Sequence, residues 1–284
     1  MGLTVGVSGC TSQSQNSDVV TAGSYKTAVY PLDQYRVSYE QLTTLTRAVA
    51  VVTQKCMRRF GFDVPVPANL SNGKFQGMDD RYGLADADHA RTLGYHDKKP
   101  TPVEVTYESR FPLEATAVLQ GVDPTTGQPI PATDARGVPA GGCRKEGIRA
   151  LFAGTASESA NGDLAEDLIR DALKRSTADD RVQKLIKKWQ ECGKKAGYEW
   201  STPHNVRVDW SNKSIGTPKP NQEEIDAALT DVRCKNESGL LDTWVSVNVE
   251  FQKKSQETNS EKLRQYKAEN DTHLKNAATI LTAG

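Results

Sequence analysis

The residues with the richest chemistry in this chain are its five cysteines. Cys10 ends the small-residue run Val7-Ser8-Gly9-Cys10, and the other four lie far inside, at positions 56, 143, 192 and 234. We interpret Cys10 as a candidate lipid anchor, and the polar, uncharged run that follows it as a flexible tether. A frayed N-terminus that happens to contain a cysteine is the alternative. The even number of inner cysteines predicts two disulfides and an exported protein.

Two of the inner cysteines share a sequence context. Cys56 and Cys192 are each followed by two basic residues, then by a glycine and an aromatic residue at the same spacing. Pro67 and Pro203 lie at the same 136-residue offset. Chance similarity between two helix ends is the alternative, because a glycine after a basic last turn is what any helix C-terminus favours. The repeated cysteine favours an internal duplication.

The repeat selects one disulfide pairing among the three that four cysteines allow. If each half of the chain is one unit, Cys56 pairs with Cys143 and Cys192 pairs with Cys234. In a reducing compartment the same four residues would be buried thiols. No pair has the short spacing of zinc ligands, and the four histidines are scattered, so we predict neither a metal site nor a cofactor.

The common catalytic and nucleotide-binding signatures are absent from the sequence. It contains no G-x-S-x-G, H-E-x-x-H, G-x-G-x-x-G or G-x-x-x-x-G-K-[ST] pattern. The histidines stand among polar residues, which is typical of surface or hydrogen-bonded positions, and the carboxylates between positions 158 and 171 resemble the acidic start of a helix. We therefore predict no catalytic residue.

Aromatic residues in predicted loops are the candidates for ligand binding. Such rings can stack on sugars or peptides, although filling the core between helix ends is the alternative role. The candidates are Tyr198, Trp200, Trp210, Phe62 and Tyr95.

The segments that position these residues are predicted to be mainly helical. Apolar residues at helical spacing predict helices over 39–59, 113–120 and 222–235, and a short helix capped by Asp86 and ended by Gly94. One long helical pattern runs over 163–195, and another continues from 241 nearly to the C-terminus. The proline-punctuated stretch from Pro203 to Pro220, which contains Trp210, is predicted to be a polar loop.

The expected fold is mainly α: a helical domain of two pseudo-repeated halves with long loops, stapled by disulfides. Residues 1–35 would be a signal remnant and tether, residues 36–160 a first half with a loop-rich insert, and residues 161–284 a second half with long C-terminal helices. Only nine residues precede Cys10 and none is charged, so we expect the true start to lie upstream. The 36 basic and 36 acidic residues leave no net charge that would indicate a nucleic-acid partner.

Several motifs carry a resemblance to a known group of proteins. They are the run from Cys56 to Phe62, the segments 81–84 and 94–96, and the run from Asp231 to Lys235 leading to Trp244. Over most of residues 36–282 the chain is similar to the uncharacterised secreted proteins and lipoproteins that actinobacteria encode in many copies. That family brings no established activity. The chain departs from a full lipoprotein precursor because it lacks a recognisable basic n-region.

These observations favour a binding protein over an enzyme. We expect a lipid-anchored or secreted protein on the outer face of the cell membrane, which binds or sequesters a small molecule, a peptide or an envelope component. The rival is a secreted envelope hydrolase without a familiar motif. A deep pocket with converging carboxylates or histidines would favour the hydrolase, and a shallow groove would favour binding.

Overall fold

The computed structural model describes residues 24–66, 81–96, 111–131, 137–156, 163–213 and 216–283. These residues are mainly helical and contain no β-strand, only an isolated bridge between Val122 and Pro129. The predicted fold class is confirmed. In the described ranges the α-helices are α1 (Tyr39–Arg59), α3 (Ala87–Leu93), α4 (Leu113–Gln120), α5 (Gly142–Leu151), α6 (Leu164–Ala178), α7 (Asp180–Lys195), α8 (Pro203–Lys213), α9 (Gln222–Ser238), α10 (Leu240–Thr258) and α11 (Ser260–Thr282).

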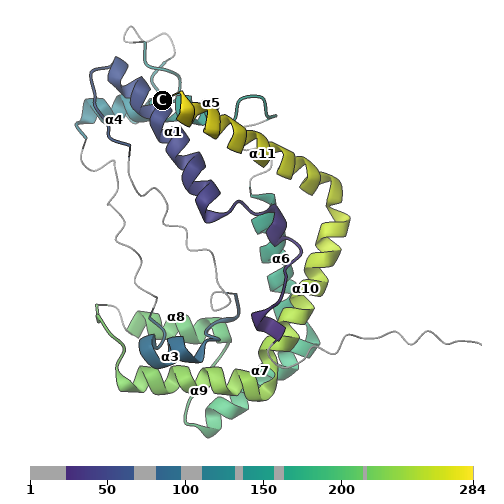
Figure 1. Cartoon of the computed structure of the whole chain (residues 1–284). Helices are drawn as coiled ribbons and strands as arrows, with labels where there is room; N and C mark the ends of the chain where they lie inside the picture. The colour runs from purple at the N-terminus through teal and green to yellow at the C-terminus, as the bar shows by residue number, and fades with distance from the viewer. Residues whose placement is uncertain are drawn as a thin grey trace, which may run out of the picture.

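The helices form two groups joined by a column (Figure 1). In one group α1 packs on α5 and on α11, and α4 packs on α5; in the other, α9 packs on α3 and α7. The column consists of α6 and α10, which pack on each other, and α10 also contacts α7. Because α3 packs on α9 and α11 packs on α1, contacts cross the boundary at residue 160. The division into sequential halves stays a prediction.

Helix α1 is built as its sequence predicts. The Ser38 hydroxyl accepts a hydrogen bond from the Gln41 amide while the Gln41 side chain accepts one from the Ser38 amide, so the first turn is capped on both sides. The apolar stripe carries Cys56 and Met57 into a fully buried core. A Cβ on Gly147 of α5 would lie 2.7 Å from the backbone of α1, so this glycine permits the close approach of the two helices.

The C-terminal ends of α1 and α7 have the same backbone structure. The Phe62 amide donates to the Met57 carbonyl at 3.1 Å, and 136 residues later the Tyr198 amide donates to the Gly193 carbonyl at 2.9 Å. The glycine before each aromatic residue has a positive φ, 82° in one case and 90° in the other. The duplicated motif is therefore duplicated in structure at these two helix ends.

The duplication does not extend to the partner helices. Cys143 is the second residue of α5, whereas Cys234 lies near the end of α9. Cys143 is therefore bonded to its partner from the start of its helix, and Cys234 from near the end of its helix. The predicted pseudo-repeat of whole halves is not confirmed.

The predicted long helix over 163–195 is wrong, because the chain bends at Asp179. The backbone of Asp179 is extended, with ψ 135°, and its carboxylate accepts a hydrogen bond from the Arg181 amide. Asp179 thus ends α6 and caps α7. The C-terminal pattern is also interrupted, at Asn259 between α10 and α11, but there ψ is 19° and no side chain caps the first turn of α11.

The predicted polar loop after Pro203 is also wrong over its first part, which forms α8. Proline at the first position of a helix loses no hydrogen bond, because that amide has no intrahelical partner. The Thr202 hydroxyl accepts a hydrogen bond from the Asn205 amide at 3.1 Å, so the residue before the proline caps the helix. Pro203 therefore starts a helix where the sequence predicted the start of a loop.

Candidate functional site

A groove with a volume of about 540 Å³ lies between α6, α7 and the start of α8. Its floor is apolar. Ile169 and Ile186 are 5% exposed and Trp244 is 3% exposed, and the partly buried Leu173 completes the surface. Trp244 is held in place because its indole N–H donates to the Ser176 hydroxyl at 3.2 Å. A pre-formed apolar floor of this kind suits the hydrophobic part of a ligand.

The walls of the groove carry an excess of positive charge. Lys174 on α6 and Lys187 on α7 are exposed and lie within 4 Å of no carboxylate in the described part of the chain. Arg170 also lines the groove, but its guanidinium is paired with Asp167 at 2.6 Å. Two unpaired ammonium groups above an apolar floor favour an acidic group on the ligand.

Arg81 closes the groove on the side of the core. Its side chain is 6% exposed, and its guanidinium pairs with Asp33 at 3.0 Å and lies over the Tyr30 ring, 4.3 Å from the ring centroid. Its charge is therefore already compensated by the protein. We assign Arg81 a structural role in shaping the wall.

The groove does not present the constellation expected of the rival hydrolase. His204 and Glu166 both line it, but the Glu166 carboxylate accepts a hydrogen bond from Arg36. Among the described residues no hydrogen bond or ion pair joins His204 to a carboxylate. Nothing in this arrangement orients a general base.

A buried polar network joins α9 to α7 and to the residues Leu84 and Tyr95, and sequence reasoning missed it. Asp231 and Lys235 of α9 are fully buried, and the Lys235 ammonium donates to Asp231 at 3.0 Å and to the Leu84 carbonyl at 2.7 Å. Asp231 also accepts from the Trp189 indole at 2.9 Å and from the Tyr95 hydroxyl at 3.2 Å. Burial and the neighbouring carboxylate raise the pKa of Tyr95, so its hydroxyl stays a donor.

Two of the predicted ligand-binding residues belong to the core. Tyr95 is 1% exposed and Trp210 is 8% exposed, and their rings stack with centroids 6.1 Å apart. They were expected in loops, but Trp210 lies on α8 and Tyr95 is tied to Asp231. Phe62 is partly buried against the core around Cys56. None of the three lines the groove.

The other two predicted residues form a ring stack outside the groove. Trp200 stacks on the buried Trp189 with centroids 5.0 Å apart, and Tyr198 stacks on Trp200 at 5.3 Å. A Cβ at position 193 would lie 2.4 Å from the Trp200 ring, so Gly193 makes room for it. Gln190, which lines the groove, donates to the carbonyl of Trp200, so the stack supports one edge of the groove.

Both predicted disulfides are present. Cys56 is bonded to Cys143 with a Cα–Cα distance of 5.5 Å, and Cys192 to Cys234 with a distance of 5.7 Å. Cys10 lies outside the described residues.

Within the described residues no group of three His, Cys, Asp or Glu side chains is arranged to hold a metal ion. The described helices include none that combines the length and apolar character needed to cross a membrane. No protein-family model, curated protein or solved structure matches the chain.

Proposed function

We propose that this protein is an exported binding protein whose groove between α6, α7 and α8 takes an amphipathic ligand with an acidic group. The observation that carries the proposal is the pairing of an apolar floor with two uncompensated ammonium groups, those of Lys174 and Lys187. Their cationic side chains would meet the acidic group, while Leu173, Ile186 and Trp244 would contact the apolar part. Sequestration of such a compound outside the cell fits this arrangement.

A fluorescent amphipathic anion tests the groove directly. 1-Anilinonaphthalene-8-sulfonate is expected to bind the folded protein saturably. The double substitution Lys174→Ala/Lys187→Ala should weaken that binding about tenfold, because each exposed charge pair contributes up to about 1 kcal/mol. The neutral analogue N-phenyl-1-naphthylamine should bind both proteins equally, since it uses only the apolar floor.

The matched control is Lys184→Ala/Lys194→Ala. It removes the same number of positive charges, both of them from α7, but neither Lys184 nor Lys194 lines the groove. This control should bind the sulfonate dye like the unmodified protein. Equal weakening in both double variants, or no effect in either, would contradict the proposal. Unfolding midpoints of all variants check that the fold is unchanged.

The two disulfides are compatible with an extracellular or secreted protein. We propose in addition that the chain is related to the actinobacterial lipoproteins, and that its exported form is held at the outer face of the cell membrane through Cys10. Two acyl chains on Cys10 would give stable anchoring, which a single chain does not. The mass of the N-terminal peptide from native membranes tests this, and a peptide that reads through an unmodified Cys10 would refute it.

A further inference from the structure

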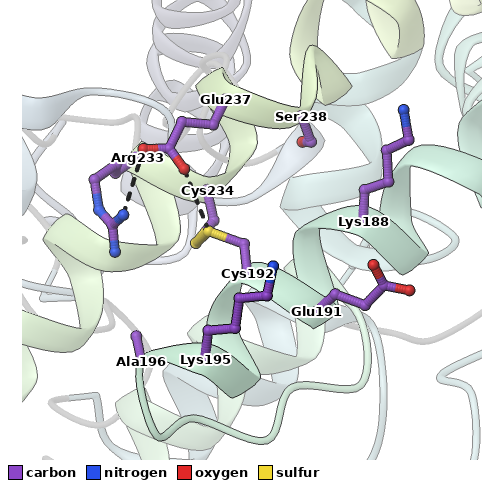
Figure 2. A pocket seen from close by; sticks show the side chains of 9 residues that line it. All are labelled: Lys188, Glu191, Cys192, Lys195, Ala196, Arg233, Cys234, Glu237 and Ser238. Carbon is purple, nitrogen blue, oxygen red and sulfur yellow. Dashed lines mark hydrogen bonds and ion pairs between the residues drawn. A yellow bond between two sulfur atoms is a disulfide. The ribbon is translucent and has the colours of Figure 1, made fainter.

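The Cys192–Cys234 disulfide lies at a hollow in the surface (Figure 2). The hollow has a volume of about 540 Å³ and is lined by the last turns of α7 and α9. Figure 2 shows the disulfide among the charged side chains of both helices. The charged residues that line the hollow are Lys188, Glu191, Lys195, Arg233 and Glu237.

The two disulfides differ in their access to solvent. Cys56 and Cys143 are both 0% exposed and belong to a closed core. Cys234 is also 0% exposed, but Cys192 is partly exposed and opens onto the hollow. The Cys192–Cys234 pair therefore has one cysteine that is open to solvent in the folded protein, whereas the Cys56–Cys143 pair has none.

The charges around Cys192 act in opposite directions on an approaching anion. A Glu237 carboxylate oxygen lies 3.6 Å from the Cys192 sulfur, a contact without a shared proton because the sulfur is in a disulfide. Glu237 also pairs with Arg233 at 3.3 Å. Lys188 and Lys195 lie within 4 Å of no carboxylate in the described residues, so their charges are available to a ligand.

We propose that this disulfide is a site of thiol–disulfide exchange, at which a small thiol with an acidic group forms a mixed disulfide with Cys192. The thiolate attacks the Cys192 sulfur, the Cys192–Cys234 bond breaks, and its electron pair leaves on the Cys234 sulfur, which takes a proton from water. A second thiolate attacks the outer sulfur of the mixed disulfide. It releases the oxidised thiol dimer and leaves Cys192 reduced.

The lining of the hollow selects the class of thiol. Lys188 and Lys195 would hold the acidic group of the incoming molecule, and their positive charge would also favour the negative charge that spreads over three sulfurs during the attack. The carboxylates of Glu191 and Glu237, which also line the hollow, oppose that charge. A carboxylate-bearing thiol is therefore expected to react faster than a neutral thiol at the same thiolate concentration.

The test uses the full chain with Cys10→Ser, so that no other free thiol is present. The folded protein is treated with 3-mercaptopropionate or with 2-mercaptoethanol at equal thiolate concentration, then quenched with acid, alkylated and mapped by mass spectrometry. We expect the mixed disulfide on Cys192, the alkyl group on Cys234 and an intact Cys56–Cys143 bond. Attachment at Cys234, opening of both disulfides at equal rates, or no exchange would overturn the proposal.

Three variants test the role of the charges. Lys188→Ala/Lys195→Ala should abolish the preference for the acidic thiol, and Lys184→Ala/Lys194→Ala, outside the hollow, should keep it. Glu237→Gln should speed the reaction of both thiols about fivefold, as expected for one charge at about 4 Å in a hydrated site. A missing preference in the unmodified protein, or a preference that survives the loss of Lys188 and Lys195, would overturn the assignment of an acidic thiol.

Discussion

Replacing Lys235 by methionine is expected to lower the free energy of unfolding by about 3–5 kcal/mol. Methionine keeps most of the apolar stem but removes the ammonium, which donates to Asp231 at 3.0 Å and to the Leu84 carbonyl at 2.7 Å. Both partners are buried. The Leu84 carbonyl would lose this donor out of reach of water, and the Asp231 carboxylate would lose its positively charged partner, keeping the neutral donors of Trp189 and Tyr95. Urea unfolding of the two proteins measures the difference.

The chain contains a matched control for this substitution. Lys267 and Asp271 form an ion pair at 3.1 Å with the same four-residue separation, but their side chains are 54% and 59% exposed. Lys267→Met should cost less than about 1 kcal/mol. Adding Asp231→Leu to Lys235→Met should restore part of the loss, because the uncompensated carboxylate is gone. Similar costs at Lys235 and Lys267 would contradict the interpretation.

This comparison shows a limit of prediction from sequence. Asp231 and Lys235 have the separation of an ordinary surface pair on a helix, and interleaved charges of this kind predict a solvated face. Their burial arises because α3 and α7 pack on α9 from distant parts of the chain. The four-residue separation does not distinguish this pair from Lys267 and Asp271.

The groove was missed for a related reason. Lys174 and Lys187 are 13 residues apart, about 20 Å along one continuous helix, and the sequence favoured such a helix. The cap formed by Asp179 divides that stretch into α6 and α7, and both lysines then line one groove. Aspartate is a good capping residue, but a single such residue within a strong helical pattern is a weak signal for a break.

Features that depend on local sequence were predicted well. The bounds of α1 and α4, the Asp86 cap and the Gly94 stop of α3 follow from apolar spacing and from terminal residues. The disulfide pairing is a long-range property. The assumption that each half is one unit selected the correct pairing, although the structure repeats only the helix ends that carry Cys56 and Cys192.

Loss of the Cys56–Cys143 disulfide should be among the most destabilising changes in the protein. The bond closes a loop with a sequence separation of 87 residues, and the chain-entropy relation gives about 4.6 kcal/mol for a loop of that length. The same relation gives about 3.9 kcal/mol for Cys192–Cys234, whose separation is 42 residues. The difference in stabilisation between the two disulfides grows further, because both cysteines of the first pair are buried, whereas Cys192 is partly exposed.

The measurement compares Cys56→Ala/Cys143→Ala with Cys192→Ala/Cys234→Ala, both with Cys10→Ser, by urea unfolding. The first double variant should lose more free energy of unfolding than the second, by at least the roughly 0.7 kcal/mol that the loop lengths alone give. A larger loss from the Cys192–Cys234 pair would contradict this ranking. Such a result would mean that the Cys192–Cys234 disulfide stabilises the ends of α7 and α9 more than the Cys56–Cys143 disulfide stabilises the core between α1 and α5. Opening the Cys192–Cys234 bond would then disturb the fold beyond the hollow.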